Sequence, residues 1–201
     1  MKTLLIATNN PGKIAEITAI LAPLPLKLIT PIDLGLTLSI PEDGRSYFEN
    51  AYKKAAAFAQ ASGLPTLADD SGLEVEALDG APGVRSHRYL ADHSATDGQR
   101  CQALLNQLSA FPRPWKAAFH CEVVLCNASE LVLRSHGICS GEVIPEFRGK
   151  NGFGYDPIFL VEGTYQTMAE LTDEQKNCIS HRAKALQAAW DDLLKFASTQ
   201  C

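Results

Sequence analysis

The stretch from Thr8 to Lys13 joins an apolar run to a segment of helical spacing, and this junction constrains the fold most. Residues 4–7 suit a buried strand, whereas Ile14, Ile17 and Leu21 recur at the spacing of one helix face. The asparagines, proline and glycine between them are typical of a turn. The sequence therefore predicts a strand, a tight turn and a helix, a building unit of α/β proteins.

This junction also suits an anion. Pro11 fits the first helical position, where its missing N–H has no intrahelical partner, and Gly12 has no Cβ to keep a ligand from the backbone. The free first-turn N–H groups, the positive end of the helix dipole and Lys13 all favour negative charge. The expected ligand is a phosphate, bound by Thr8, Asn9, Asn10, Pro11, Gly12 and Lys13. A capped helix start with a solvated lysine explains the same residues equally well.

The rest of the chain alternates between strand and helix signals. Capping-box patterns are present at Ser46 with Glu49, at Thr96 with Gln99 and at Thr172 with Gln175. Gly63 is placed to end the helix that Ser46 opens. Strands are predicted at 26–30, 66–73, 116–126, 131–143 and 158–160, and helices at 46–62, 96–108 and from 180 onward. A hairpin at 127–130 beside the crossover units implies a mixed sheet.

Composition excludes several classes of protein. The chain has 201 residues and a net charge of -5, which fits one domain with a sizeable core and disfavours binding of a nucleic acid polymer. No leader pattern and no membrane-spanning apolar run is visible. Six cysteines without a C-x-x-C pair indicate reduced thiols, so we expect a cytoplasmic protein that does not bind membranes.

Three acidic residues are candidates for metal chemistry. Asp69 and Asp70 follow the apolar residues 66–68, and adjacent carboxylates at the end of a buried strand favour a nearby cation or a raised pKa. Oxygen ligands of this kind suit Mg²⁺, which takes one or two protein carboxylates together with water and substrate phosphates. Glu42 is a further candidate, although a solvated acid in a turn explains it equally well.

Basic and aromatic residues complete the set of candidates. Lysines and arginines that could neutralise a polyphosphate are Lys13, Lys53, Lys54, Lys176, Arg88 and Arg182, although each taken singly is more often a solvated surface charge. Phe153 and Tyr155 lie among glycines and could stack on a base. His181 and Arg182 open a helix and could direct donors into one space.

Six motifs occur together and in order. They are Thr8-Asn9-Asn10-Pro11-Gly12-Lys13, Glu49-Asn50-Ala51 with Lys54, Ala68-Asp69-Asp70-Ser71-Gly72-Leu73, Gly80-Ala81-Pro82-Gly83 with Arg88, Gly152-Phe153-Gly154-Tyr155-Asp156-Pro157, and Ser180-His181-Arg182. From Lys2 to about Leu194, the chain closely resembles the inosine triphosphate pyrophosphatase family.

The resemblance implies one bilobed domain over 1–201, with an elongated mixed sheet flanked by helices, a nucleotide cleft between two lobes and a homodimer. It implies Mg²⁺-dependent hydrolysis of dITP, ITP and XTP to the monophosphate and pyrophosphate. Asp70 matches the family's general base and a metal ligand, and Glu42 matches the other metal-site carboxylate. The matching substrate contacts are Thr8 to Lys13, Ser71, Phe153, Gly154, Tyr155, Asp156, Lys176, His181 and Arg182, with Lys54, Asp69 and Arg88 as accessory residues.

Purine selectivity follows from hydrogen-bonding chemistry. Hypoxanthine and xanthine present an acceptor at O6 where adenine presents a donor, so donors from His181 and Arg182 would favour the former. Arg85 and His87 depart from the family pattern in their loop. Two alternatives stay open, a Maf-like pyrophosphatase for other modified or pyrimidine nucleotides and a nucleotide-binding regulator without turnover.

Overall fold

The structure is a computed structural model that describes residues 1–92 and 94–199. Its described strands form a six-stranded sheet in the order β2-β1-β3-β4-β5-β6. β1 pairs in parallel with β2 and β3, whereas β5 and β6 are antiparallel. The predicted α/β class and mixed sheet are therefore confirmed.

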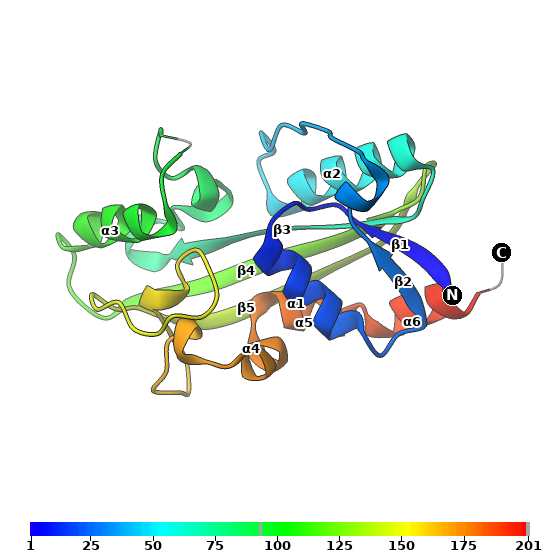
Figure 1. The fold of residues 1–201 in the computed structure, drawn as a ribbon. Helices are drawn as coiled ribbons and strands as arrows, with labels where there is room; N and C mark the ends of the chain where they lie inside the picture. Colours follow the sequence, from blue (N-terminus) through cyan, green and yellow to red (C-terminus); the bar gives the residue numbers. More distant parts are fainter. Residues whose placement is uncertain (93, 200–201) are drawn as a thin grey trace. The chain divides into compact units, whose positions relative to one another are not determined.

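Helices and strands alternate up to α3, after which the strands β4 to β6 and the helices α4 to α6 follow in turn (Figure 1). They are β1 (Lys2–Ile6), α1 (Pro11–Leu21), β2 (Leu26–Ile29), α2 (Tyr47–Ser62), β3 (Thr66–Val75), α3 (Asp97–Leu108), β4 (Trp115–Cys126), β5 (Leu131–Val143), β6 (Phe159–Val161), α4 (Asp173–Ile179), α5 (His181–Ala188) and α6 (Trp190–Ser198). Short 3-10 helices occur at Ile32–Leu34, Glu76–Leu78, Gly83–Arg88, Asp156–Ile158 and Met168–Glu170.

The chain divides into two compact units. The first comprises Met1–Asp70, Cys121–Gly137 and the chain from His181 on, and the second comprises Ser71–His120 and Ile138–Ser180. The strands β3, β4 and β5 each supply residues to both units. The two lobes with a nucleotide cleft stay a prediction.

The first unit has helices on both faces of its strands. Leu4 and Ile6 of β1 belong to a core cluster with residues of α1, α5 and α6, whereas Leu5 and Ala7 pack against α2. This split follows from the alternation of side chains along a strand. Figure 1 shows α2 on one side of β1 and β3, with α1 and α5 on the other.

The second unit has its own core. Leu73 and Val75 of β3 cluster with Leu104 and Leu108 of α3 and with buried residues of β4, β5 and β6. Phe119 and Phe159 bring their ring centroids within 4.6 Å inside this cluster. Leu104, Leu105 and Leu108 form the buried face of α3. Cys121, Cys126 and Cys139 are also buried, while Cys201 lies outside the described residues.

The predicted helix caps are confirmed with one change. Thr96 and Thr172 form full capping boxes with Gln99 and Gln175. Ser46 accepts from the Glu49 N–H, but the Glu49 carboxylate accepts from the Arg45 N–H at 2.7 Å instead of completing the box at Ser46. Glu49 therefore ties down the loop before the helix.

The structure departs from the sequence predictions at three places. β3 continues for ten residues to Val75, so the two aspartates lie inside a strand and not at its end. The 3-10 helix at Gly83–Arg88 was not predicted. The predicted C-terminal helix is divided into α5 and α6 at Ala189, and Leu194 of α6 is 42% exposed. Local patterns do not reveal such changes, because tertiary packing decides them.

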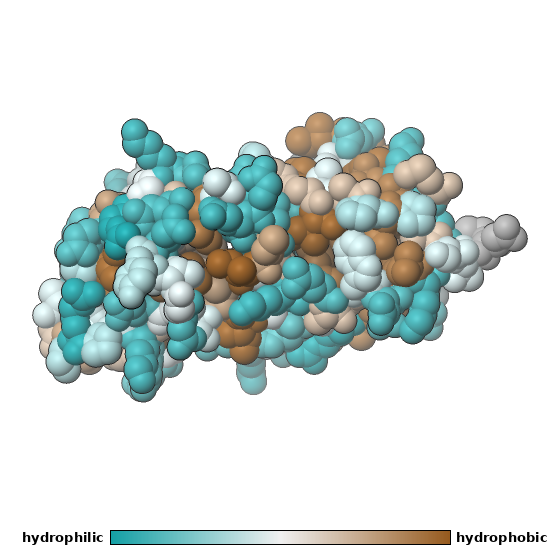
Figure 2. Space-filling model, turned by 90° about the horizontal axis from the view of Figure 1, so that it is seen from below, coloured by the Kyte–Doolittle hydropathy of each residue, from teal (hydrophilic) through white to brown (hydrophobic). Residues whose placement is uncertain are grey.

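Apolar residues on the face drawn in Figure 2 form separate groups among polar ones. None of the helices in the described ranges combines the length and the apolar character that crossing a bilayer requires.

We expect Gly137→Ala in β5 to destabilise the protein. A Cβ at this position would lie 2.2 Å from the His181 carbonyl oxygen and 2.3 Å from the Ala185 nitrogen of α5, and neither backbone atom can move alone. Overpacking of this kind costs about 1–3 kcal/mol or more in the free energy of unfolding. The matched control Gly98→Ala in α3, where the nearest atom is 3.9 Å away, should gain up to about 1 kcal/mol from helix propensity. Urea unfolding measures both, and equal stability of the two variants would contradict the packing argument.

Candidate active site

The adjacent aspartates of β3 serve different clusters within the first unit. Successive side chains of a strand point to opposite faces, so Asp69 shares the face of α1 and α5 while Asp70 shares the face of α2. The sequence predicted a nearby cation or a raised pKa for this pair. In the structure each carboxylate has its own basic partners, and burial raises the pKa of Asp70.

Asp69 is the centre of a buried ion cluster. Its Oδ2 accepts from Arg182 Nε and Nη2 at 3.1 and 2.9 Å and lies 3.0 Å from Lys13 Nζ. Arg182 is completely buried, and its Nη1 also contacts the Glu16 carboxylate of α1. Two acids and two bases thus neutralise one another where unpaired charge would be costly.

This cluster keeps Asp69 ionised. Burial by itself would raise the pKa of Asp69, but Lys13 and Arg182 outweigh it and hold the pKa well below its usual range. The same contacts raise the pKa of Arg182, although burial opposes this. Asp69 therefore serves as a fixed negative charge.

Asp70 lies in a different set of contacts. Its Oδ2 accepts from Asn50 Nδ2 at 3.0 Å, and its Oδ1 lies 3.4 Å from Lys54 Nζ. Lys54 also contacts Glu42 Oε1 at 2.8 Å, so the two carboxylates converge on one ammonium group. Burial lowers the pKa of Lys54, but the nearby acids, Asp70 and Glu42 foremost, raise it by more, so the pKa lies above its ordinary value.

The protonation behaviour of Asp70 is opposite to that of Asp69. Burial raises the pKa of Asp70, Lys54 and Lys13 oppose the rise, and Glu42 adds to it, so that the pKa stays above its ordinary value. A carboxylate with a raised pKa is a stronger proton acceptor than an ordinary one. Perturbed carboxylates of this kind are typical of functional sites.

Glu42 and Asp70 fit a divalent cation. Both direct an oxygen at the same Lys54 ammonium, which shows that positive charge between them is favourable. The described residues contain no cluster of three or more His, Cys, Asp or Glu that would form a complete protein cage. Two carboxylates match Mg²⁺, which usually keeps waters and takes its remaining ligands from substrate phosphates.

The helix start after β1 forms as predicted. Asn10 is the N-cap of α1, its side chain accepts from the Lys13 N–H at 3.1 Å, and Pro11 occupies the first turn. Thr8 Oγ1 accepts from the Asn10 N–H at 3.2 Å. Lys13 extends from this turn to Asp69 and links the helix start with the buried ion cluster.

The glycine-rich loop in the second unit is held by a buried ion pair. Asp156 Oδ2 accepts from Lys176 Nζ at 2.6 Å and from the Phe153 N–H at 2.9 Å. The Lys176 ammonium also lies 4.8 Å from the centre of the Phe153 ring. Gly152 adopts a φ of +73°, and a Cβ there would lie 2.1 Å from Asp156 Oδ2, so only glycine fits. The loop therefore holds Phe153 in one orientation.

Further contacts anchor the same loop. The Gly154 N–H donates to Asp97 Oδ2 at 2.8 Å, and the Tyr155 hydroxyl donates to the Ser86 carbonyl at 2.9 Å. Ser86 Oγ in turn accepts from the Leu73 N–H at 2.8 Å. Tyr155, which the sequence suggested as a stacking face, is 3% exposed and is a packing residue. Arg88 Nη2 donates to the Val84 carbonyl at 3.5 Å within the 3-10 helix that contains Ser86.

The structure brings most predicted residues into three groups. The first unit joins Lys13, Asp69 and Arg182 in one cluster and Glu42, Lys54 and Asp70 in another, and the second unit joins Phe153, Asp156 and Lys176. His181 begins α5 and is 5% exposed. Lys53, in contrast, pairs with Asp43 through a side chain that is 43% exposed and joins none of these groups.

Sequence reasoning missed three polar residues in these groups, Glu16, Asn50 and Asp97. Glu16 is the one acid of α1, and it follows Lys13 by three residues, which places both on one helix face. That spacing was the available signal. Asn50 was part of a motif without an assigned role, and nothing local marked Asp97 beyond its place after a helix cap.

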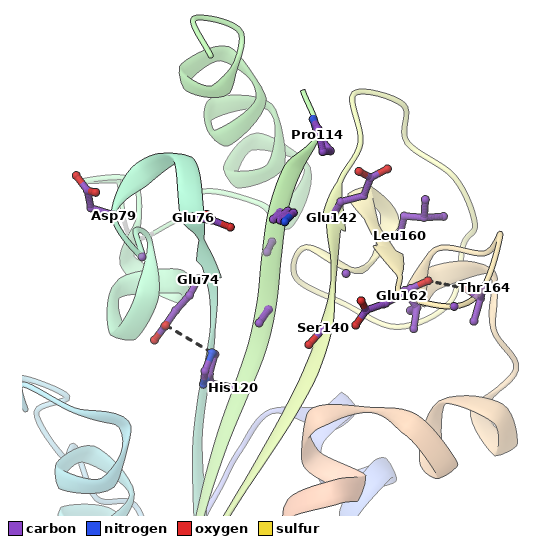
Figure 3. A pocket seen from close by; sticks show the side chains of 17 residues that line it. Glu74, Glu76, Asp79, Pro114, His120, Ser140, Glu142, Leu160, Glu162 and Thr164 are labelled. Atoms are coloured by element: carbon purple, nitrogen blue, oxygen red, sulfur yellow. Dashed lines mark hydrogen bonds and ion pairs between the residues drawn. The ribbon is translucent and has the colours of Figure 1, made fainter. Parts of the chain in front are cut away.

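A groove in the second unit is lined by none of the residues of these groups (Figure 3). Its volume is about 820 Å³, and its lining includes the five acids Glu74, Glu76, Asp79, Glu142 and Glu162 with the basic residues Lys116 and His120. His120 Nε2 lies 3.5 Å from Glu74 Oε2. None of the predicted site residues lines it, and its acidic character would repel a triphosphate.

Known proteins are similar to this chain over almost its full length. The sequence profile of the Ham1 family matches residues 4–192. A dITP/XTP pyrophosphatase of Geobacter sulfurreducens is 43% identical over 194 residues, covering 96% of this chain and 97% of that protein. The structure of a HAM1 protein from Coxiella burnetii has 43% identity and a TM-score of 0.87, covering 97% of this chain and 100% of that one. A nucleoside-triphosphatase / dITP/XTP pyrophosphatase of Mycobacterium abscessus has 39% identity and a TM-score of 0.74, covering 92% and 97%.

We expect Asp69→Asn to cost about 3–5 kcal/mol of unfolding free energy, because it leaves Arg182 poorly compensated in the core. The pKa of Asp69 is lowered on folding, so its contribution is present above the unfolded pKa near 4 and is lost as pH falls through the folded pKa. Below about pH 4, the stability of the parent protein should therefore fall more steeply than that of the variant.

Urea unfolding between pH 7 and pH 2.5 measures this difference. The matched control is Asp192→Asn, which removes an exposed carboxylate paired with Lys195 and should have little effect. Parallel pH profiles for the parent and Asp69→Asn would refute the role of the ion cluster.

Proposed function

Because this chain belongs to the Ham1 family, we propose that it is a dITP/XTP pyrophosphatase, which hydrolyses non-canonical purine nucleoside triphosphates to the monophosphate and pyrophosphate. The family resemblance read from the six motifs is confirmed by these comparisons. The residue roles and the metal remain parts of the proposal. The assignment of roles rests on the opposite pKa shifts of the two adjacent aspartates, since the pKa is lowered for Asp69 and raised for Asp70.

Asp70 is the general base of the proposed reaction. Attack of water on the α-phosphorus needs a group that accepts the proton of the water, and a raised pKa makes Asp70 suited to this task. Asp69 is unsuited, because Lys13 and Arg182 stabilise its ionised form and occupy its Oδ2. Asp69 instead positions Lys13 and Arg182.

Positive charge must compensate the triphosphate. Mg²⁺, held by Glu42 and Asp70, would polarise the phosphoryl oxygens and neutralise the charge that develops on the leaving pyrophosphate. Lys54 lies between these two carboxylates and is positioned to approach a phosphate oxygen. The phosphate tail binds to Lys13 and to the free N–H groups in the first turn of α1. Thr8 to Asn10 directly precede this helix, and Pro11 and Gly12 are its first two residues.

Base recognition is assigned to the start of α5 and the glycine-rich loop. His181 and Arg182 supply donors for the O6 acceptor of hypoxanthine or xanthine, and Asp69 and Glu16 fix the Arg182 guanidinium before the base arrives. Phe153 stacks on the base, while Lys176, Asp156 and the buried Tyr155 support its loop. Ser71 and Gly154 complete the contacts. Preorganised groups lose less entropy on binding, which favours selectivity. The homodimer and the cytoplasmic location stay predictions.

We expect purified protein with Mg²⁺ to release pyrophosphate from dITP and XTP about 100-fold or more faster than from dATP, dGTP, dCTP or dTTP. In Asp70→Asn, kcat should fall roughly 10²- to 10⁴-fold because the base is lost. A pyrimidine preference would support the Maf-like alternative, and binding of dITP without turnover would support the regulator.

We expect EDTA to abolish turnover and Mg²⁺ to restore it. Glu42→Gln should raise the Mg²⁺ concentration for half-maximal activity by roughly 10- to 100-fold, because one of two carboxylate ligands is neutralised. Glu49→Gln is the control, since its side chain still accepts from the Arg45 N–H. Equal Mg²⁺ requirements for the parent and Glu42→Gln would remove Glu42 from the metal site.

A further inference from the structure

Asn50 of α2 is buried between two groups that use its side chain in opposite ways. Its Oδ1 accepts from the Gly44 N–H at 2.8 Å, and its Nδ2 donates to Asp70 Oδ2 at 3.0 Å. The side chain is embedded in the first unit, with the residue 1% exposed. Because a backbone N–H can only donate and an ionised carboxylate can only accept, the amide has one satisfied orientation.

The loop before α2 approaches Asn50 so closely that no side chain fits at its contact point. A Cβ on Gly44 would lie 2.5 Å from Asn50 Oδ1 and 2.8 Å from the Cβ of Glu49. Glu42 lies two residues before Gly44 in the same loop. Asn50 therefore ties the segment that carries Glu42 to the strand that carries Asp70.

This tie determines how Asp70 faces its other partners. With Oδ2 held by Asn50, Oδ1 is the oxygen directed at Lys54 Nζ, 3.4 Å away, where Glu42 Oε1 also converges. A carboxylate without this restraint could rotate and exchange its two oxygens. Small losses of alignment between reacting groups have large effects on rate.

We propose that Asn50 is a positioning residue that sets the orientation of Asp70 and its register with Glu42. The inference rests on the proposed function, which makes Asp70 the base. Asn50 hydrogen-bonds Asp70 and the Gly44 N–H, and it is not one of the residues assigned to the triphosphate or the base. Its loss should therefore lower kcat and leave the KM for dITP nearly unchanged.

The test uses the isosteric variant Asn50→Asp, which keeps an acceptor for Gly44 but replaces the donor to Asp70 by a second carboxylate. We expect kcat for dITP to fall by about 10- to 100-fold, the effect of losing one hydrogen bond to a charged group, with KM within threefold. Asn106→Asp makes the same chemical change at an exposed position, where the side-chain oxygen accepts from Gln102 Nε2, and its kcat should match the parent.

Thermal unfolding gives a readout independent of turnover. Asn50→Asp should lower the melting temperature, because two buried carboxylates then face each other. The exchange variant Asn50→Asp with Asp70→Asn restores a donor and an acceptor across the same contact, so it should recover most of that loss while remaining inactive. Asp70→Asn alone completes the double-mutant cycle.

Each outcome decides the proposal. A kcat for Asn50→Asp within threefold of the parent, or an exchange variant that recovers no stability, would overturn it. If Asn50→Asp does not fold, a folded exchange variant supports the coupling and an unfolded one refutes it. If the parent protein releases no pyrophosphate from dITP, the proposed function fails, while the melting temperatures still report on the contact between Asn50 and Asp70.

Discussion

The contact between Arg182 and Asp69 is the interaction on which the arrangement of the first unit depends. A completely buried guanidinium is tolerable only when carboxylates and hydrogen bonds surround it, and here Asp69 from β3 and Glu16 from α1 do so. The contact joins the start of α5 to the sheet and, through Lys13, to the start of α1. Two helix starts and one strand are thus held together by hydrogen-bonded ion pairs, which are directional, and not by apolar packing alone.

Strand alternation gives the two neighbouring acids separate tasks. Asp69 faces the arginine and lysine that keep it ionised, while Asp70 faces α2, where burial and Glu42 raise its pKa. A single residue step along β3 therefore yields one structural charge and one candidate base. Each acid has a partner from the helix on its own face: Arg182 of α5 donates to Asp69, and Asn50 of α2 donates to Asp70.

In the second unit, a buried ion pair likewise holds a loop in place. Asp156 neutralises the buried Lys176 and accepts from the Phe153 N–H, so one carboxylate fixes both a charge and a backbone turn. Gly152 allows this carboxylate to approach, because any Cβ would displace it. Asp97 and Ser86 hold the loop from α3 and from the 3-10 helix Gly83–Arg88. An aromatic side chain supported in this way is ready to stack without prior ordering.

The sequence by itself determined the α/β class, the helix start at Pro11, the caps at Thr96 and Thr172 and the family, since these depend on local hydrogen bonds, on periodicity and on motifs in order. It also selected Asp70, Glu42 and Lys54 as residues of one site. It could not show that Asp69 and Asp70 lie within a long strand and face different helices, that Glu16 and Asn50 complete their contacts, or that the last helix breaks at Ala189. Those features depend on which distant side chains meet in the core, and only the tertiary structure decided them, because burial and pairing of charges are set by contacts between residues far apart in the chain.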